Sequence, residues 1–393
     1  MLRKINFVVL IAFVLALLAT SLIFYSTNKK SPDQKKTAVS DAKKIAAVSP
    51  GDNSFFVSGW IPYWRKTEGV ASLQGNLNLF SEINPFAFSV APDGSLIDTA
   101  QINSAPWSQL FQEAKAANVQ VVPTILWTDA LAMHKVFTDP TLLDNHIDAI
   151  VSMLKKNNFP GVDIDYEGKD VADRNNFSSF LEDLHQKLQP LGKTLDCTVE
   201  ARTQDLPPTG WTGTRAMSYA NDFSALDQYC DSVRVMAYDE VFQVYRAQSF
   251  ENTASSPYAP NADNQWVKQV LEYALRYISP QKLILGIPTY GWEFHVTKTA
   301  NTYEYTDIGS ISYPAAIAEA KAHNVVPQRT SGGELSFTYL ASDGEHLVTF
   351  EDAASIRQKI SIAQTLHIEG ISLFKIDGSS DPQLFPMLNK TLK

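Results

Sequence analysis

The sequence predicts a parallel (β/α)₈ barrel that carries a small α+β insertion and follows an N-terminal transmembrane anchor. Eight strand-like segments alternate with helix-like segments in residues 54–393. This stretch exceeds the roughly 250 residues that such a barrel needs, and the surplus lies between the seventh and eighth strands. Hydrophobic residues make up 45% of the chain, enough for one large core. A doubly wound open sheet is the alternative, but no glycine-rich phosphate loop follows the first strand.

The chain begins with a long apolar segment. Residues 5–25 are almost all apolar and follow Arg3 and Lys4, and at 1.5 Å per residue they can cross a bilayer. We expect residues 1–27 to be an uncleaved signal anchor, because a cleaved signal peptide usually has a shorter apolar core. Residues 28–53 are polar and contain no aromatic residue, which predicts a flexible linker before a barrel at 54–393.

The barrel elements are predicted from residue type and periodicity. The strands are short runs rich in β-branched and aromatic residues, at 54–64, 85–90, 120–127, 159–167, 194–201, 232–238, 282–288 and 370–376. The helices are predicted at 107–117, 142–158, 176–188, 225–229 and 266–277. In 142–158, for example, Ile147, Ile150, Val151 and Leu154 recur at helical spacing.

The predicted insertion occupies about residues 293–350. It combines a helix at 313–323 with two strands at 335–339 and 346–350. The intervening Asp343-Gly344 pair favours a tight hairpin turn. We interpret the insertion as a small α+β unit that forms one wall of a cleft.

The fourth strand, residues 159–167, carries three acids at alternate positions. Asp163, Asp165 and Glu167 would share one face, since side chains alternate along a strand. Mutual repulsion and burial should raise the pKa of at least one of them, as a general acid requires. A solvated acidic face and a site for a hard cation are the alternatives. A helix before the strand and Gly168 after it favour a parallel sheet with functional residues at its carboxyl end.

Composition excludes several classes of function. A net charge of −9 and a pI near 5.3 provide no basic surface for nucleic acid. The histidines form no H-E-x-x-H pattern and Cys197 and Cys230 have no metal-ligand spacing, so we expect no metal site. Whether the two cysteines pair is open, but two buried free thiols are the commoner outcome in a body of this size.

Residues 160–167 resemble the D-G-x-D-x-D-x-E signature of glycoside hydrolase family 18, the chitinase-like family. Other family motifs are matched in order: M-x-Y-D by 236–239, P-x-Y-G by 288–291, and the segment before the last barrel helix by 350–352 with Ser355 and Lys359. Tyr238-Asp239-Glu240 is also similar to the bacterial spore-cortex and cell-wall N-acetylglucosaminidases, although the LysM repeats common there are absent. The resemblance covers nearly all of residues 54–393.

Two positions depart from the family pattern. Pro160 replaces the first acid of the signature, which we expect to cost a structural hydrogen bond rather than activity. Phe374 stands where the family usually has a tryptophan beneath the sugar. A phenylalanine offers a smaller face, which makes crystalline chitin a less suitable substrate.

The resemblance implies a role for each acid and for Tyr238. Glu167 would protonate the glycosidic oxygen, while the substrate's own 2-acetamido group acts as the nucleophile. Asp165 would hold the acetamide N–H, with Asp163 behind it sharing a proton. Tyr238 would donate a hydrogen bond to the acetamide oxygen, although it could be an ordinary buried tyrosine. Asp239 would contact the sugar, although it could equally be a helix N-cap or a loop acid.

Aromatic side chains at strand ends are the candidate sugar-binding surface, since sugar rings stack on them through their C–H faces. Each could instead belong to the core. The candidates are Trp60, Trp127, Tyr290, Trp292 and Phe374.

The expected activity is that of a retaining β-N-acetylglucosaminidase without metal or cofactor, acting on peptidoglycan or chitin-like oligomers. The polysaccharide and, through the N-terminal helix, a membrane are the expected partners. The catalytic part would be extracytoplasmic, or secreted if the signal is cleaved, although Lys29, Lys30, Lys35 and Lys36 oppose that orientation. The alternatives are a non-catalytic sugar-binding protein and an envelope protein with a merely solubilising acidic strand.

Overall fold

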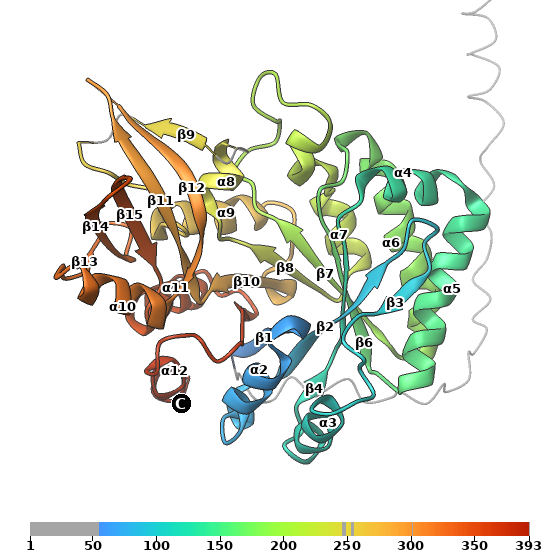
Figure 1. The fold of residues 1–393 in the computed structure, drawn as a ribbon. Helices are drawn as coiled ribbons and strands as arrows, with labels where there is room; N and C mark the ends of the chain where they lie inside the picture. The colour runs from blue at the N-terminus through green and yellow to red at the C-terminus, as the bar shows by residue number, and fades with distance from the viewer. Residues whose placement is uncertain (1–54, 246–248, 253–254, 301, 393) are drawn as a thin grey trace, which may run out of the picture. The chain divides into compact units, whose positions relative to one another are not determined.

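A computed structural model describes residues 55–245, 249–252, 255–300 and 302–392. Eight parallel strands form its central sheet, and β1 pairs with both β2 and β16, which closes the sheet into a barrel (Figure 1). The predicted barrel is therefore confirmed, and the open-sheet alternative is wrong. The barrel strands are β1 (Phe56–Pro62), β2 (Glu82–Val90), β5 (Thr124–Trp127), β6 (Gly161–Tyr166), β7 (Thr194–Glu200), β8 (Ser232–Met236), β10 (Leu283–Pro288) and β16 (Gly370–Phe374). The short strands β3 (Leu96–Asp98) and β4 (Gln120–Val121) also pair with β2.

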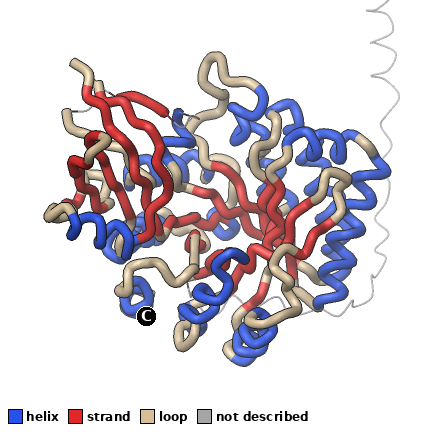
Figure 2. The backbone as a smooth tube through the Cα atoms, in the orientation of Figure 1, coloured by secondary structure: helices blue, strands red, loops and turns tan. Residues whose placement is uncertain are grey.

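Helices surround the barrel strands (Figure 2). They are α2 (Lys66–Leu73), α3 (Trp107–Ala116), α4 (Ala130–Thr138), α5 (Pro140–Asn157), α6 (Arg174–Leu188), α7 (Phe223–Tyr229), α8 (Glu240–Tyr245), α9 (Asn264–Ala274), α11 (Ala353–Thr365) and α12 (Leu384–Thr391). Short 3₁₀ turns lie between them at η1 (Tyr63–Arg65), η2 (Leu77–Leu79), η3 (Val171–Asp173), η4 (Gln189–Leu191), η5 (Gly213–Ala220) and η6 (Pro280–Lys282).

The helix before the acidic strand shows how local sequence defines these elements. The Asp139 carboxylate caps the N-terminus of α5 by accepting hydrogen bonds from the N–H groups of Thr141 and Leu142. Pro140 occupies the first turn, where its missing N–H has no cost. Asn158 ends the helix in the left-handed conformation. These signals place the start of β6 and with it the position of the acids.

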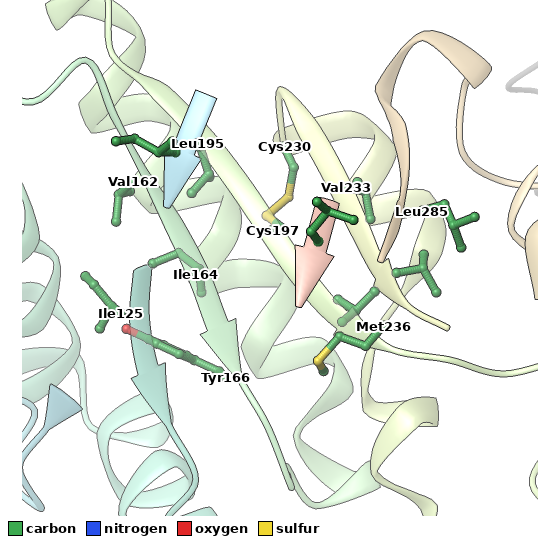
Figure 3. Packing of buried hydrophobic residues seen from close by; sticks show 14 of the residues in the cluster. Ile125, Val162, Ile164, Tyr166, Leu195, Cys197, Cys230, Val233, Met236 and Leu285 are labelled. Carbon is green, nitrogen blue, oxygen red and sulfur yellow. A yellow bond between two sulfur atoms is a disulfide. The ribbon is translucent and has the colours of Figure 1, made fainter. Parts of the chain in front are cut away.

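The two faces of β6 have opposite environments, as predicted. Val162, Ile164 and Tyr166 are completely buried in the layer between barrel and helices (Figure 3). There the Tyr166 ring stacks on Phe180, with centroids 5.5 Å apart. Asp163 and Asp165 point from the other face into the barrel interior, where Asp163 meets side chains of neighbouring strands.

Cys197 and Cys230 form a disulfide, so the expectation of two free thiols is wrong. Cys197 lies on the helix-facing side of β7, opposite Ile164 in the strand register. Cys230 ends α7, which leads directly into β8 beside β7. This return brings the two Cα atoms to 6.1 Å, within bonding range (Figure 3). The pairing depends on strand order, which the spacing of two cysteines does not reveal.

The insertion forms a second, antiparallel sheet beside the barrel (Figure 1). The predicted helix is α10 (Tyr313–Ala322), and the predicted hairpin is β14 (Leu335–Ala341) with β15 (Gly344–Phe350). The sheet also contains β9 (Ser249–Asn252), β11 (Tyr290–Lys298), β12 (Tyr303–Ser312) and β13 (Gln328–Arg329). It therefore begins before residue 293 and recruits β9 from the connection after β8. Gly291 permits the close crossing of β11 and β15, because a Cβ there would lie 2.0 Å from the Thr349 carbonyl oxygen.

The described residues include no helix that is long and apolar enough to span a membrane. The predicted anchor at 1–27 and the predicted linker at 28–53 lie outside the described residues.

Candidate active site

A cavity of about 260 Å³ opens at the carboxyl ends of the barrel strands. Its volume is close to the lower limit of roughly 300 Å³ for ligand pockets, which suits one sugar-sized ring. Strands β1, β2, β5, β6, β8 and β16, or the residues just after them, contribute to its wall. The lining includes Trp64, Phe86, Asp165, Glu167, Tyr238 and Phe374. The structure thus brings together three of the four predicted catalytic residues, with Asp163 beneath them.

Asp163 is completely buried and has donors on both carboxylate oxygens. One oxygen accepts hydrogen bonds from Trp60 Nε1 at 3.0 Å and from Thr124 Oγ1 at 2.8 Å. The other accepts from Thr198 Oγ1 at 2.8 Å and lies 3.6 Å from Arg234 Nη1. These contacts fix the Asp163 carboxylate below the cavity floor.

Arg234 anchors a buried charge cluster that sequence reasoning missed. It pairs with Glu82, with Asp196 at 3.1 Å and with Asp163, so one cation meets three acids. Burial raises the pKa of Glu82 to about 8, although Arg234 opposes this effect. The three acids lie on β2, β6 and β7, and only the closed barrel makes them neighbours.

Asp165 lies above Asp163 and is 1% exposed. Its Oδ1 has no hydrogen-bond partner among the described residues. Burial, followed by the charges of Glu167 and Asp163, raises its pKa well above the usual range. This environment favours a protonated carboxyl in the free protein, as the sequence predicted for at least one of the acids.

Glu167 follows β6 directly and is partly exposed in the cavity. Its N–H donates to the Trp127 carbonyl oxygen at 2.8 Å, which continues the β5–β6 pairing. Burial and the charge of Glu200 raise its pKa to about 7, while Lys169 acts in the opposite direction. A carboxyl with this pKa can both donate and accept a proton near neutral pH.

Glu200 and Lys169 form a buried pair beside Glu167, with Nζ and Oε2 3.9 Å apart. Glu200 also accepts hydrogen bonds from Gly168 N at 3.0 Å and Asn221 Nδ2 at 2.6 Å. It therefore holds the turn that follows the acidic strand. Lys169 lies two residues after Glu167, so its place near the acid could be predicted from the sequence. Its partner Glu200 could not, because it comes from β7.

Tyr238 and Phe374 form a stacked pair in the cavity wall. Their ring centroids are 5.4 Å apart and their planes differ by 6°. Phe374 also contacts Trp60 edge-on, with centroids 5.9 Å apart. Phe374 thus occupies the position where the sequence placed a sugar-binding aromatic, and it also supports Tyr238.

Asp239 is held by two of the predicted aromatic residues. Its Oδ1 accepts hydrogen bonds from Tyr290 Oη at 2.7 Å and from Trp292 Nε1 at 2.8 Å. Burial raises the pKa of Asp239, against the effect of these two hydrogen bonds. Tyr290 is 5% exposed and lines a neighbouring cavity of about 380 Å³ that also includes Trp64. Asp239 therefore lies in the loop after β8, with its carboxylate bound to two aromatic residues of β11.

Two predicted sugar-stacking residues are almost completely buried. Trp127 is 2% exposed and packs against Phe137, His146 and Tyr166 on the helix side of β5. Its interpretation as a cleft residue is wrong, because its register partner is Tyr166, whereas Leu126 pairs with Asp165 and lines the cavity. Trp60 is 1% exposed at the cavity floor, so its role is to hold Asp163.

Trp64 and Phe86 are the cavity aromatics that the site prediction missed. Trp64 is 50% exposed and contacts Phe86 edge-on, with centroids 6.2 Å apart. Trp64 follows the first predicted strand closely, and that position was the available signal. Phe86 lies inside β2, where nothing in the sequence distinguishes a cavity-facing residue from a core residue.

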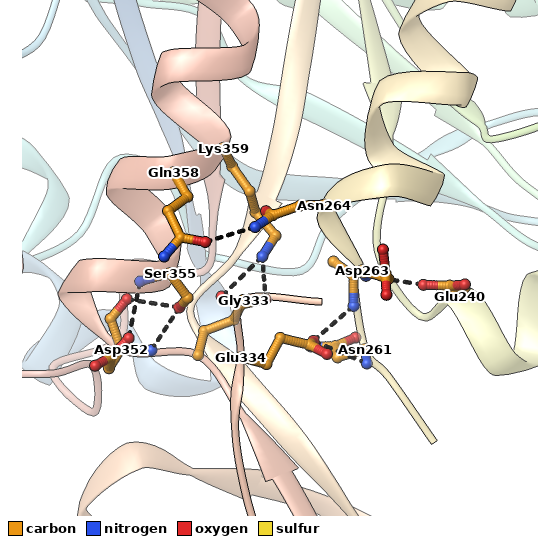
Figure 4. Close-up of polar contacts among 12 residues, drawn as sticks. Glu240, Asn261, Asp263, Asn264, Gly333, Glu334, Asp352, Ser355, Gln358 and Lys359 are labelled. Carbon is orange, nitrogen blue, oxygen red and sulfur yellow. Dashed lines mark hydrogen bonds and ion pairs between the residues drawn. The ribbon is translucent and has the colours of Figure 1, made fainter. Parts of the chain in front are cut away.

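Glu334 of the insertion contacts Asn261 (Figure 4), and Asn261 in turn contacts Asp239. Asn261 Oδ1 accepts a hydrogen bond from Asp239 N at 2.9 Å, and Asn261 Nδ2 donates to the Tyr290 carbonyl oxygen at 3.0 Å. Glu334 Oε1 in turn accepts from the N–H groups of Asn261 at 2.9 Å and Ala262 at 2.7 Å. A continuous chain of hydrogen bonds therefore connects the insertion to the active-site loop.

No group of three or more His, Cys, Asp or Glu side chains in the described part of the chain could hold a metal ion. The acids of the site are bound to protein donors or lie along one strand face, and the protein groups themselves supply the candidate acid–base chemistry.

The model of a known family, glycosyl hydrolases family 18, matches residues 59–379. The chain belongs to glycoside hydrolase family 18. The family 18 signature therefore lies on β6, and its acids point into the barrel as the resemblance implied.

The relatives of this chain share only about a quarter of its sequence. The uncharacterized glycosylase YvbX of Bacillus subtilis (strain 168) is 24% identical over 250 residues, which cover 63% of this chain and 66% of that protein. The match with this chain thus spans just under two thirds of the length of YvbX. The cortical fragment-lytic enzyme of Bacillus cereus is 27% identical over 345 residues, 82% of this chain and 74% of that protein. The crystal structure of the Bacillus cereus spore cortex-lytic enzyme SleL has the same fold, with a TM-score of 0.68 at 24% identity, over 86% of this chain and 75% of that one.

Proposed function

We propose that this protein is a retaining glycosidase that cleaves β-1,4 bonds next to N-acetylglucosamine in peptidoglycan or chitin-like oligosaccharides. One observation carries the proposal: Glu167, whose pKa is raised to about 7, shares a cavity with Asp165 and Tyr238. A carboxyl of this kind can protonate a leaving glycosidic oxygen.

The mechanism needs one proton-donating acid, because in family 18 the substrate's acetamido group is the nucleophile. Glu167 donates its proton to the glycosidic oxygen while the acetamido oxygen attacks the anomeric carbon and the glycosidic bond breaks. Glu167 then takes a proton from the water that opens the resulting oxazolinium ion, so the anomeric configuration is retained.

Asp165 and Tyr238 orient the acetamido group in this mechanism. The unpartnered Oδ1 of Asp165 supplies an acceptor for the acetamide N–H, and the Tyr238 hydroxyl supplies a donor for its oxygen. Asp163, with donors on both oxygens, is held beneath Asp165 and shares a proton with it. Asp165 stabilises the positive charge of the ring that forms.

Cell-wall glycan is the better-supported substrate class. The cortical fragment-lytic enzyme is a relative over 82% of this chain, and Phe374 gives a smaller platform than the tryptophan of chitinases. Short or soluble glycans are therefore favoured over crystalline chitin.

The proposal is tested by measuring reducing ends released from purified peptidoglycan and from N-acetylglucosamine oligomers. The full-length chain is compared with Glu167→Gln, which keeps the side-chain shape but removes the acid. We expect the variant to lose at least about 10²-fold in kcat. Binding of the oligomers by both proteins without cleavage by either would instead indicate a sugar-binding protein.

We also propose that residues 1–27 anchor the protein in a membrane with the barrel on the extracytoplasmic side. The length of the apolar run supports the anchor, and the extracytoplasmic side follows from the proposed activity on cell-wall glycan. Protease accessibility of the barrel in intact cells, with fractionation of the membranes, tests it. A barrel found only in the cytoplasm would contradict the proposal.

A further inference from the structure

A second cavity adjoins the active site at Gln243. It has a volume of about 170 Å³, whereas the active-site cavity has about 260 Å³, so it suits a substituent of a sugar rather than a ring. We call it the Arg202 pocket. Its lining includes Arg202, Thr203, Trp211, Gln243, Val244 and Trp266. Gln243 lines both cavities, so the Arg202 pocket lies beside the active-site cavity.

Arg202 is a buried cation without a carboxylate partner. The side chain is 6% exposed, forms no ion pair with any described residue, and has no hydrogen-bond acceptor for Nε or Nη1 among them. Asp222, whose charge acts on Arg202, is already bound to Arg174 at 3.1 Å. Arg234, the other deeply buried arginine among the described residues, has three acids around it. An unpaired buried guanidinium is therefore an exception in the described part of the chain.

Aromatic rings pack against the Arg202 guanidinium but do not provide hydrogen-bond acceptors for its N–H groups. Its Cζ lies 4.2 Å from the Phe223 ring centroid, 5.2 Å from that of Tyr219 and 5.4 Å from that of Tyr273. These faces attract the positive charge, but the in-plane N–H groups still need acceptors. Burial lowers the pKa of Arg202, which shows the cost of removing the charge from water. An anion in the pocket would supply the hydrogen-bond acceptors and the negative charge that the protein does not provide for Arg202.

The surroundings of the pocket favour an anionic ligand further. Arg215 Cζ lies 5.3 Å from the ring centroid of Trp211, a lining residue, so a second cation lies near the pocket. Gln243 Oε1 is buried without a partner among the described residues. It offers an acceptor to a hydroxyl or amide of the same ligand at the junction of the two cavities.

We propose that the Arg202 pocket binds a carboxylate carried by the sugar next to the cleavage site. This inference rests on the proposed glycosidase function and narrows its substrate to peptidoglycan. In peptidoglycan, N-acetylglucosamine alternates with muramic acid, whose lactyl group or attached peptide carries carboxylates. Chitin oligomers have only neutral acetamido sugars and would leave Arg202 unpaired.

Binding to the full-length Glu167→Gln chain, in a detergent without a sugar headgroup, tests the proposal without turnover. Calorimetry compares the disaccharide of N-acetylglucosamine and N-acetylmuramic acid with the same disaccharide whose lactyl carboxylate is reduced to an alcohol. We expect the acidic form to bind at least about tenfold more tightly. Adding Arg202→Gln should abolish this preference and leave the affinity for the reduced form within about twofold. The inference would be overturned if the Glu167→Gln chain bound the acidic disaccharide, the reduced disaccharide and a disaccharide with a dipeptide on its lactyl group equally well. A preference for the acidic form that survives Arg202→Gln would also overturn it.

Two further comparisons guard against a variant that merely misfolds. Val244 is exposed at the pocket, so Val244→Glu should offer Arg202 a competing carboxylate and remove the preference, while Val244→Gln keeps it. Arg276 stacks on the same Tyr273 ring as Arg202 but is exposed outside the pocket lining, and Arg276→Gln should change nothing. Loss of the preference in Val244→Gln as well would contradict the charge-based account.

The source of the carboxylate is identified with a third ligand, the disaccharide bearing a dipeptide on its lactyl group. Dependence on Arg202 for the peptide-free disaccharide assigns the lactyl carboxylate, and dependence only for the dipeptide form assigns the peptide. If Arg202→Gln affects neither ligand while the wild-type chain cleaves peptidoglycan, this inference fails and the proposed function stands. If the wild-type chain neither binds nor cleaves any of these glycans, both fail.

Discussion

Glu167 changes its protonation state near neutral pH, because burial and Glu200 raise its pKa to about 7. A carboxyl with a raised pKa keeps its proton below that pH and loses it above. We therefore predict that kcat/KM falls as the pH rises through about 7, since the glycosidic oxygen then has no proton donor. Measuring kcat/KM on a soluble glycan over a range of pH tests this prediction, because the decline above about pH 7 forms the alkaline limb of the profile.

Variants of the Glu200–Lys169 pair should move that limb in opposite directions. Glu200→Gln removes a negative charge and frees Lys169, so both effects favour ionised Glu167 and shift the limb to lower pH. Lys169→Met removes the cation and shifts it to higher pH. A limb that stays in place in both variants would show that another group controls it.

Trp64 and Trp127 separate sugar binding from packing. Trp64 is half exposed in the cavity, so Trp64→Ala should weaken oligosaccharide binding about tenfold with little effect on stability. Trp127 is buried among aromatic rings, so Trp127→Ala should lower the free energy of unfolding by about 3–5 kcal/mol. Calorimetric titration and urea unfolding measure the two effects. If Trp127→Ala weakened binding without lowering the free energy of unfolding, Trp127 would be a cleft residue and the prediction would be contradicted.

Sequence alone could not make that distinction. Trp60, Trp64 and Trp127 all stand at or near the end of a predicted strand, where residues of a barrel site are expected. Which face each ring occupies depends on the register with the next strand, as the pairing of Trp127 with Tyr166 shows. The acids of β6 were predictable because they define one face by themselves, whereas Lys169 and Glu200 meet only through the pairing of two strands.

At the scale of elements, the hairpin of the insertion supports the active-site loop through Glu334. We predict that Glu334→Ala lowers kcat about tenfold and the free energy of unfolding by about 1–3 kcal/mol, because the N–H groups of Asn261 and Ala262 lose their acceptor. Burial raises the pKa of Glu334 well above its usual value, so Glu334→Gln is a close match in charge and shape.

This matched variant should keep the oxygen that both N–H groups need. We expect Glu334→Gln to retain kcat within about threefold of the parent. Steady-state kinetics with urea unfolding of the same samples separates the two effects. Equal losses in the alanine and glutamine variants would show that the acceptor is not what matters.

The elements that sequence missed have weak periodic signals. The barrel strands are short apolar runs between turns, and all eight were located by that pattern. In contrast, the apolar pattern of β12 is interrupted by Asp307 and Gly309, and β9 has only four residues. Such strands form because neighbouring strands pair with them, so their signal lies in the tertiary structure.

At the scale of the whole molecule, the disulfide fixes α7 to β7 outside the active site. Replacing both Cys197 and Cys230 by alanine should lower the free energy of unfolding by about 3–4 kcal/mol, given a sequence separation of 33. Activity at 25 °C should persist, because both sulfur atoms lie on the helix-facing side. Unfolding of the parent with and without a reductant provides the control. Unchanged stability in the double variant would contradict the prediction.

The closure of the barrel has a consequence for how the chain is made. Since β1 lies between β2 and β16, the first and last strands of the barrel are neighbours. A growing chain cannot complete the cylinder until residues 370–374 have been synthesised and have left the ribosome or an export channel. Until then β1 and β10 each expose an unpaired edge, which can pair with other chains. Biogenesis of this protein therefore requires that a chain of more than 300 residues be kept apart from its copies until its final strand arrives.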